Sequence, residues 1–267
     1  MKKCFLVTLL VLLMSLSAVV TAPAGPIIDR ILQRGELVVG TAGNMPPLNA
    51  TSKDGKVIGF EADIARFMAG GMGVKLKMAT MDFARLLPSL KAGKIDMIIS
   101  AMTITPQRNL KVAFVGPYFI SGKGILTRYE TMASIDDAAK LNSPDKTLAA
   151  LEGSTSQLFV ERVISKAKLV KAKTYDEALD LVLKGKVDAL IADYPYCTLS
   201  AYRYRQQGLV TVNKPFTYEP LGIALPPNDP LLVNWVQNSL RTLEGSGELR
   251  RLQKRWFEDA SWLKDLP

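Results

Sequence analysis

Two segments of this 267-residue chain repeat one order of residue types. Residues 90–99 read LKAGKIDMII, and residues 183–191 read LKGKVDALI. Each segment has a glycine at the end of an amphipathic helix pattern, then a basic residue and an aspartate, then a short apolar run. This order is typical of a helix that ends at glycine and leads into a buried strand. Because repeated helix–strand units build parallel sheets, the repeat predicts two similar α/β lobes.

Polar residues follow both of these buried strands. The first strand is followed by Ser100, Thr103 and then Arg108, and the second ends at Asp193. Ligands of open α/β sheets bind at the carboxyl ends of the strands. An arginine guanidinium can make two parallel hydrogen bonds to a carboxylate. The sequence therefore predicts that the segment 96–108 binds a carboxylate.

A third polar strand end lies between the two repeats. Residues 147–151 form a strand pattern, 152–156 read EGSTS, and a helix pattern covers about 157–167. A strand, a turn of small polar residues and a helix direct backbone N–H groups and the helix dipole toward an anion. The turn lacks the lysine and the glycine spacing of a P-loop, so nucleotide binding is not predicted.

The rest of the chain continues the alternation of helices and strands. Further helices are expected at 27–34, 59–68, 83–93, from 134, at 175–184 and at 230–256. Further strands are expected at 37–40, 74–78, 124–127, 169–172 and 210–212, with a return crossing at 216–225. Asp96 and Asp188, which stand at the same place in the two repeats, are interpreted as structural caps.

The N-terminus has the pattern of a secretory signal peptide. Lys2 and Lys3 precede an apolar stretch at 5–16, and residues 22–24 have the A-x-A form of a cleavage site. The alternative is a membrane anchor, but the run at 4–20 is short for a span of about 20 residues. We therefore expect residues 1–24 to be removed and the protein to be secreted.

Composition argues against several classes of function. Cys197 is the one cysteine outside the expected signal peptide and the chain has no histidine, so it offers no cysteine–histidine catalytic pair. We expect Cys197 to lie in the core, and we expect no metal and no cofactor. The formal net charge is +9, but the basic residues are scattered and form no stripe, so nucleic-acid binding is not predicted.

Ordered motifs along the chain resemble those of the type II periplasmic amino-acid-binding proteins of ABC importers, known as bacterial extracellular solute-binding proteins of family 3. The matching segments are GFEADIA at 59–65, LPSLKAGKID at 87–96, MTITPQR at 102–108, FVGPY at 114–118, EGST at 152–155 and GKVDALIAD at 185–193. The resemblance covers nearly the whole chain after the signal peptide, and the order and spacing of the motifs make it specific.

The resemblance implies a two-lobed Venus-flytrap fold. Each lobe would be a mostly parallel sheet flanked by helices, and two crossover strands would join the lobes. Lobe 1 would comprise residues 25–127 and 218–267, and lobe 2 residues 128–217. The protein would be a periplasmic monomer without enzymatic activity that captures an amino acid between its lobes and delivers it to a membrane ABC permease.

The resemblance also assigns roles to single residues. Arg108 would pair with the α-carboxylate of the ligand, and Asp193 would accept its α-ammonium group. Supporting contacts to the carboxylate would come from Ser100, Thr103, Ser154 and Thr155. The alternatives are a surface salt bridge for Arg108 and a strand-end cap for Asp193. Phe83 would pack on the ligand side chain, although a core role remains open.

The first ligand loop departs from the family pattern. It reads AGNMPPL at 42–48, with Met45 where an aromatic residue is common and Ala42 where binders of basic amino acids have an acid. A buried cationic side chain would have no partner there. Met45 and Met102 indicate an adaptable apolar wall. We therefore expect an amino acid with an uncharged side chain.

Two other functions are considered. Secreted cyclohexadienyl (arogenate/prephenate) dehydratases look like members of the same family, and residues 214–218 resemble theirs. Their general acid is a Glu shortly after the turn, where this chain has Gln157, and an amide cannot deliver that proton. A sensor domain of a receptor kinase is a third reading, but after residue 24 the sequence has no apolar span and no signalling domain.

Overall fold

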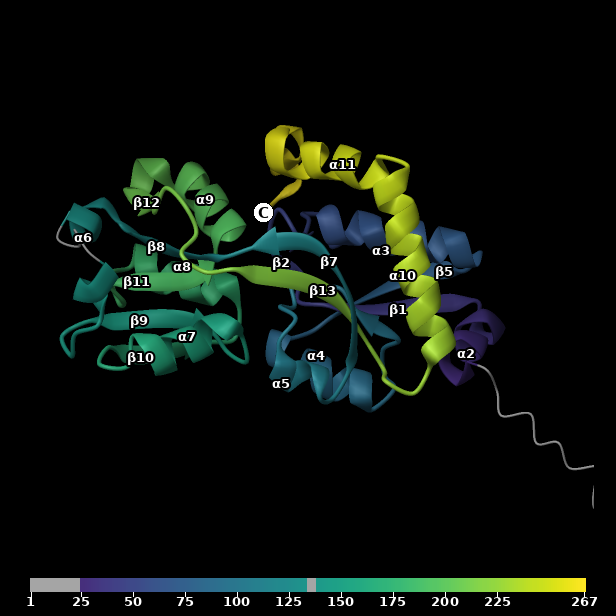
Figure 1. The fold of residues 1–267 in the computed structure, drawn as a ribbon. Coiled ribbons are helices and arrows are strands. Elements are labelled where there is room, and N and C mark those ends of the chain that lie inside the picture. Colours follow the sequence, from purple (N-terminus) through teal and green to yellow (C-terminus); the bar gives the residue numbers. More distant parts are fainter. Residues whose placement is uncertain (1–24, 134–137) are drawn as a thin grey trace, which may run out of the picture.

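The computed structural model describes residues 25–133 and 138–267 of the chain. Figure 1 shows two α/β lobes side by side, joined by extended segments. The predicted signal peptide, and the helix start predicted at residue 134, lie outside the described residues. Within the described ranges no helix has the length and apolar character that a membrane span requires.

Lobe 1 is built on a five-stranded sheet of order β5-β1-β6-β13-β7. The central strand pairs are parallel, while β13 runs antiparallel to β6 and β7. These strands are β1 (Glu36–Thr41), β5 (Lys75–Thr80), β6 (Met97–Ile98), β7 (Ala113–Ser121) and β13 (Glu219–Leu225). A small antiparallel sheet beside it contains β2 (Asn44–Met45), β3 (Asn49–Thr51) and β4 (Val57–Ile58).

Helices cover both faces of the lobe 1 sheet, with α4 and α5 below it and α3 and α11 above it in Figure 1. They are α2 (Pro26–Arg34), α3 (Phe60–Met72), α4 (Phe83–Lys91), α5 (Pro106–Asn109), α10 (Pro230–Gly245) and α11 (Glu248–Gln253). A π-helical turn, Lys254–Glu258, and a 3-10 turn, Ser261–Asp265, follow α11. This layering buries the apolar faces that the sequence pattern predicted.

Lobe 2 repeats the plan with a sheet of order β10-β9-β11-β8-β12. Its strands are β8 (Lys123–Arg128), β9 (Thr147–Leu151), β10 (Lys168–Ala172), β11 (Ala189–Asp193) and β12 (Leu209–Thr211). Its helical segments are α6 (Tyr129–Ala133), η1 (Ala138–Leu141), α7 (Thr155–Val163), α8 (Tyr175–Leu183), α9 (Tyr194–Arg203) and η2 (Arg205–Gln207). The predicted class, two α/β lobes with mostly parallel sheets, is confirmed.

The chain passes between the lobes twice, from β7 to β8 and from β12 to β13. The predicted boundary after residue 127 is wrong, because β8 is hydrogen-bonded to β11 and β12 in the second sheet. The crossing therefore lies at Gly122, between the two strands. An apolar strand pattern gives no sign of which sheet the strand joins, so the sequence alone placed it in the wrong lobe.

The repeated aspartates have the structural role that the sequence indicated. The carboxylate of Asp96 accepts a hydrogen bond of 2.8 Å from the N–H of Val38 on the neighbouring strand and pairs with Arg30 at 2.9 Å. Asp188 accepts a hydrogen bond of 2.7 Å from the N–H of Thr147 in the same way. Each aspartate thus fixes two parallel strands in register. Each lobe can then present its strand ends at one edge.

Candidate functional site

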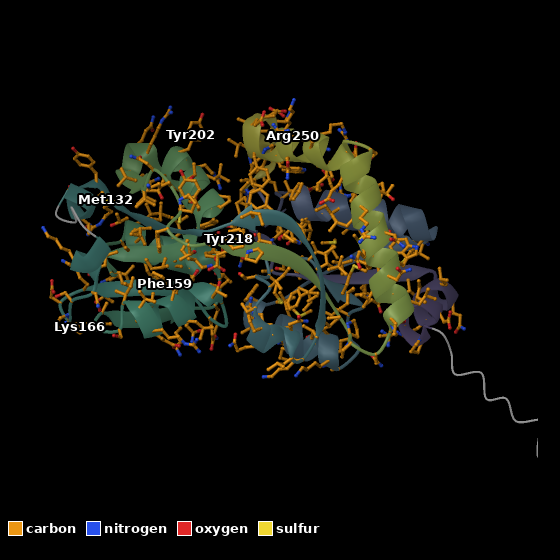
Figure 2. The ribbon with its side chains drawn as sticks, in the orientation of Figure 1. Met132, Phe159, Lys166, Tyr202, Tyr218 and Arg250 are labelled. Carbon is orange, nitrogen blue, oxygen red and sulfur yellow. The ribbon has the colours of Figure 1, made fainter. Side chains whose placement is uncertain are left out.

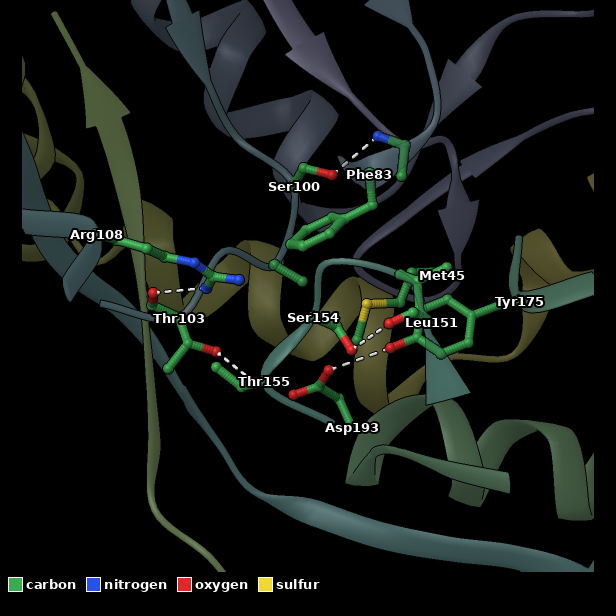
Figure 3. Close-up of a pocket in the computed structure, with 12 residues that line it drawn as sticks. Met45, Phe83, Ser100, Thr103, Arg108, Leu151, Ser154, Thr155, Tyr175 and Asp193 are labelled. Carbon is green, nitrogen blue, oxygen red and sulfur yellow. Dashed lines mark hydrogen bonds between the residues drawn. The ribbon is translucent and has the colours of Figure 1, made fainter. Parts of the chain in front are cut away.

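A pocket lies between the lobes at these strand ends (Figure 3). Its volume is about 10 Å³, which is the room of about one water molecule. Lobe 1 contributes predicted site residues Met45, Phe83, Ser100, Thr103 and Arg108 to the lining, and lobe 2 contributes Ser154, Thr155 and Asp193. Eight of the nine predicted residues therefore come together.

Arg108 is held by the short helix α5. Thr105 caps this helix by accepting a hydrogen bond of 3.2 Å from the N–H of Arg108. The guanidinium donates from Nη1 to the carbonyl of Thr103 at 2.9 Å and from Nη2 to the carbonyl of Gly153 at 3.1 Å. Its carbon lies 5.6 Å from the centre of the Phe83 ring. These contacts fix the guanidinium in the pocket. The hydrogen bond to Gly153 joins lobe 1 to lobe 2.

Burial lowers the pKa of Arg108, while the nearby carboxylates of Glu219 and Asp193 act to raise it. A guanidinium remains protonated in proteins even when its pKa is lowered. Arg108 is therefore a fixed positive charge in a largely dehydrated site, where an anionic ligand group interacts strongly with it.

Hydroxyl groups surround this charge. The Ser100 hydroxyl accepts a hydrogen bond of 2.8 Å from the N–H of Ala42, so its own proton remains available to a ligand. The hydroxyl oxygens of Thr103 and Thr155 lie 3.3 Å apart across the two lobes. Thr155 also donates to Glu219 at 3.0 Å. Because the Thr155 proton goes to Glu219, Ser100 of lobe 1 is the hydroxyl of this group that keeps a free proton for an anion.

Ser154 has a more structural place than the sequence suggested. Its hydroxyl accepts from the N–H of Gln157 at 3.1 Å and donates to the carbonyl of Leu151 at 2.6 Å, so it is the N-cap of α7. The first N–H groups of α7 have no partner inside the helix and carry its positive dipole end. Ser154 therefore positions these N–H groups. Its own hydroxyl already donates one hydrogen bond and accepts another within lobe 2.

Asp193 ends β11 and is 4% exposed. Its Oδ1 accepts from the hydroxyl of Ser121 at 3.2 Å and lies 3.3 Å from Nζ of Lys123. Its Oδ2 accepts only a long hydrogen bond of 3.4 Å, from the hydroxyl of Tyr175, among the contacts of the described residues (Figure 3). One carboxylate oxygen is therefore engaged at the hinge, and the other is available at the pocket.

The sequence matches the family of bacterial extracellular solute-binding proteins, family 3, over residues 37–259. The chain belongs to this family. A solved binding component of an ABC transporter from Wolinella succinogenes, complexed with lysine, is 38% identical with a TM-score of 0.82, covering 86% of this chain and 99% of that one.

Curated relatives include binders and one enzyme. ABC transporter arginine-binding protein 1 of Escherichia coli is 25% identical over 82% of this chain and 89% of its own length. Cyclohexadienyl dehydratase of Pseudomonas aeruginosa is also 25% identical, over 86% of each chain. The predicted family and its Venus-flytrap architecture are confirmed, and relatives of this kind differ in what they bind.

Met102 is the one predicted site residue of this family 3 protein that does not line the pocket. It is 1% exposed, and its carbonyl accepts a hydrogen bond of 3.0 Å from the N–H of Gly222. It packs in the same hydrophobic core cluster as Met45 and Phe83, and the structure does not bring it to the predicted ligand wall as it brings those two. Position in a motif does not show on which side of the backbone a residue points.

Glu61 supports the pocket, a role that was not predicted from the sequence. It is fully buried and accepts from the N–H of Ala101 at 2.6 Å, from Nδ2 of Asn49 at 2.7 Å and from the hydroxyl of Tyr118. Ala101 has a φ of 49°, in the left-handed region. Glu61 therefore holds the turn that follows Ser100.

Burial raises the pKa of Glu61 to about 7, even though its three hydrogen-bond donors act to lower it. Its carboxyl group therefore titrates in the neutral range, beside the turn that follows Ser100. The only early signal was its place in the motif GFEADIA, two residues after Gly59.

Lys123, Glu219 and Tyr175 were also missed. Lys123 could have been noticed in the sequence, because it begins an apolar strand pattern. A lysine in that position either reaches the surface or is buried with an acidic partner. Tyr175 and Glu219 gave no local signal. In the part of the chain that the structure describes, no group of three or more acidic, cysteine or histidine side chains could hold a metal ion.

Proposed function

We propose that this protein binds one amino acid with an uncharged side chain between its lobes and delivers it to an ABC permease. The observation that carries the proposal is that Arg108 from lobe 1 and Asp193 from lobe 2 line one small pocket. A zwitterion has one charge for each of them. A buried charged group is stable only when it is paired and hydrogen-bonded.

The α-carboxylate would bind to Arg108. One N–H of the guanidinium donates to the Gly153 carbonyl in this structure. A ligand carboxylate would replace that carbonyl, because a charged acceptor makes the stronger hydrogen bond. The Ser100 hydroxyl and the first N–H groups of α7 would supply further donors. These groups come from both lobes, so the carboxylate would hold the cleft closed.

The α-ammonium group would bind to Oδ2 of Asp193, the oxygen that accepts the long bond from Tyr175. The side chain would then face Met45, Phe83 and Leu151, which are apolar. A wall of this kind accepts uncharged side chains and offers no acid to a cationic one.

Entry of the ligand requires the lobes to separate. The cavity has room for about one water, and the contacts between Arg108 and Gly153 and between Thr103 and Thr155 cross it. Hinge bending of two lobes around a ligand is the motion that such a fold permits. We further propose that residues 1–24 are a cleaved signal peptide and that the mature protein works as a monomer in the periplasm.

The test is isothermal titration of ligand-free protein, prepared by unfolding and refolding, with a panel of amino acids. We expect one neutral amino acid to bind with micromolar or tighter affinity. Arg108→Ala should abolish this binding, whereas the control Arg250→Ala, on the outer surface of α11 (Figure 2), should not. Absence of binding by every amino acid would refute the proposal.

A dehydratase remains the second candidate because one relative is a cyclohexadienyl dehydratase. In this chain Oε1 of Gln157 accepts a hydrogen bond of 2.8 Å from the N–H of Gly153, and its amide has no acidic proton to give. We therefore propose that the protein is not an enzyme. Release of phenylpyruvate from prephenate by the purified protein would overturn this part.

A further inference from the structure

A lysine is buried directly behind the pocket, at the point where the chain crosses between the lobes. Lys123 is the first residue of β8, and its side chain is 1% exposed. Its backbone N–H donates to the hydroxyl of Thr217 at 2.9 Å, and its carbonyl accepts from the N–H of Phe216 at 3.0 Å. Both crossing segments thus meet at this residue, which keeps its side chain in one place.

The Lys123 ammonium lies between two carboxylates. Its Nζ is 3.3 Å from Oδ1 of Asp193 and 3.7 Å from Oε2 of Glu219. The side chains of these acids are 6% and 11% exposed. Removing one member of such a buried set leaves an uncompensated charge.

Four charged side chains in and directly behind the pocket form a balanced set. Arg108 and Lys123 are positive, and Asp193 and Glu219 are negative. Glu219 also accepts from Thr155, so the balance includes the lobe 2 hydroxyl that faces the ligand space. A ligand without net charge preserves this balance, whereas a cationic ligand adds one unpaired positive charge.

We propose that Lys123 sets the charge selectivity of the site by engaging one oxygen of Asp193 and the acid of Glu219, so that a single ligand ammonium can be accommodated. The inference rests on the proposed function and names the residue that decides its ligand class. A cationic side chain would need a free acid. The loop residue Ala42 offers none, and Lys123 has already engaged both acids behind the pocket.

A purely structural role for Lys123 makes a different prediction. If the ammonium only held the hinge together, its removal would weaken all ligands alike. If it sets selectivity, its removal changes the ratio of affinities between ligands that have the same shape and different charge. Two pairs of amino acids meet this condition: L-citrulline with L-arginine, and L-norleucine with L-lysine.

The experiment measures both pairs by titration on wild type, Lys123→Met and Lys123→Arg. Wild type should bind the neutral member of a pair at least ~10-fold more tightly than the cationic member. Lys123→Met, which keeps the length of the side chain, should shift this ratio at least ~10-fold toward the cationic member. Lys123→Arg keeps the charge and should retain the wild-type preference.

A double variant tests the same role without leaving an excess of buried negative charge. Lys123→Met leaves two acids without their cation, whereas Lys123→Met/Glu219→Gln removes one charge of each sign and still frees Oδ1 of Asp193. It should show the same shift toward cationic ligands. Thermal melting of each ligand-free variant identifies those that are folded and can be compared.

The outcomes separate this inference from the proposed function. If wild type binds no amino acid at all, the receptor function itself fails. If wild type binds amino acids but neither member of either pair, or both members equally, side-chain charge does not govern the site and the role of Lys123 is refuted. An unchanged ratio in Lys123→Met and in the double variant refutes it as well.

Discussion

The pH dependence of stability provides a strict test of whether the buried Glu61, which holds the turn after Ser100, is protonated in the folded protein. Its carboxyl group is fully buried, and burial raises its pKa from 4.5 to about 7. The folded protein therefore binds this proton more tightly than the unfolded chain does. Stability from this group is fully present below pH 4.5 and is lost as the pH rises through 7.

The magnitude follows from the two pKa values. One pKa unit corresponds to about 1.4 kcal/mol, so the whole effect is about 3 kcal/mol. Between pH 5 and pH 8 the linkage relation gives a loss of about 2.5 kcal/mol in the free energy of unfolding. The slope is steepest between the two values and vanishes above pH 8.

The assay compares urea unfolding of wild type and Glu61→Gln without ligand from pH 5 to pH 8 at constant ionic strength. The glutamine cannot titrate, and its amide faces Nδ2 of Asn49, whose Oδ1 already accepts from the N–H of Gly43 at 2.8 Å. This mismatch lowers stability by an amount that does not vary with pH. The difference between the two proteins should change by about 2.5 kcal/mol over this range, and a constant difference would show that the donors keep Glu61 ionised.

Three further changes test separate parts of the molecule. Arg108→Ala should weaken amino-acid binding by at least ~100-fold in titration, since it removes two charge-assisted bonds of about 1.5–3 kcal/mol each; binding within tenfold of wild type would exclude it as the carboxylate ligand. Asp193→Asn should lower affinity at least ~10-fold, because the amide oxygen can still accept a bond but lacks the charge. It should also lower the chemical denaturation midpoint, because the buried Lys123 ammonium loses one of its carboxylate partners. Asp229→Ala should destabilise the protein by about 3 kcal/mol without changing affinity, because the buried carboxylate accepts from the N–H groups of Ile27, Ile28 and the first turn of α10; unfolding at the wild-type urea concentration would contradict this.

The fold followed from sequence because its signals are local. The glycine, basic residue, aspartate and apolar run of each repeat specify a helix end and a strand start within ten residues, and Asp96 and Asp188 fulfil the same role in both lobes. The strand-end residues Arg108 and Asp193 could be paired in advance because parallel strands present their carboxyl ends at one edge.

The residues that were missed depend on contacts between distant parts of the chain. Glu61 bonds to Ala101, 40 positions away, and Lys123 to Asp193, 70 positions away. Met102 does not line the pocket, although its neighbours Ala101 and Thr103 do. Neither periodicity nor a motif encodes such distances and directions, so these side chains could be assigned only from the folded chain.

The distribution of these contacts over the two lobes indicates how closure is coupled to the ligand. Lys123 and Tyr175, which both donate to Asp193, belong to lobe 2 with it, so hinge bending leaves them assembled. Arg108 is different, because one of its two carbonyl partners, Gly153, lies in the opposite lobe and is lost on opening. If Asp193 binds the ammonium group and Arg108 the carboxylate, as proposed, the ammonium site is preformed in lobe 2 and the carboxylate site is completed by closure. A ligand that lacks a carboxylate would thus occupy the lobe 2 half without stabilising the closed form.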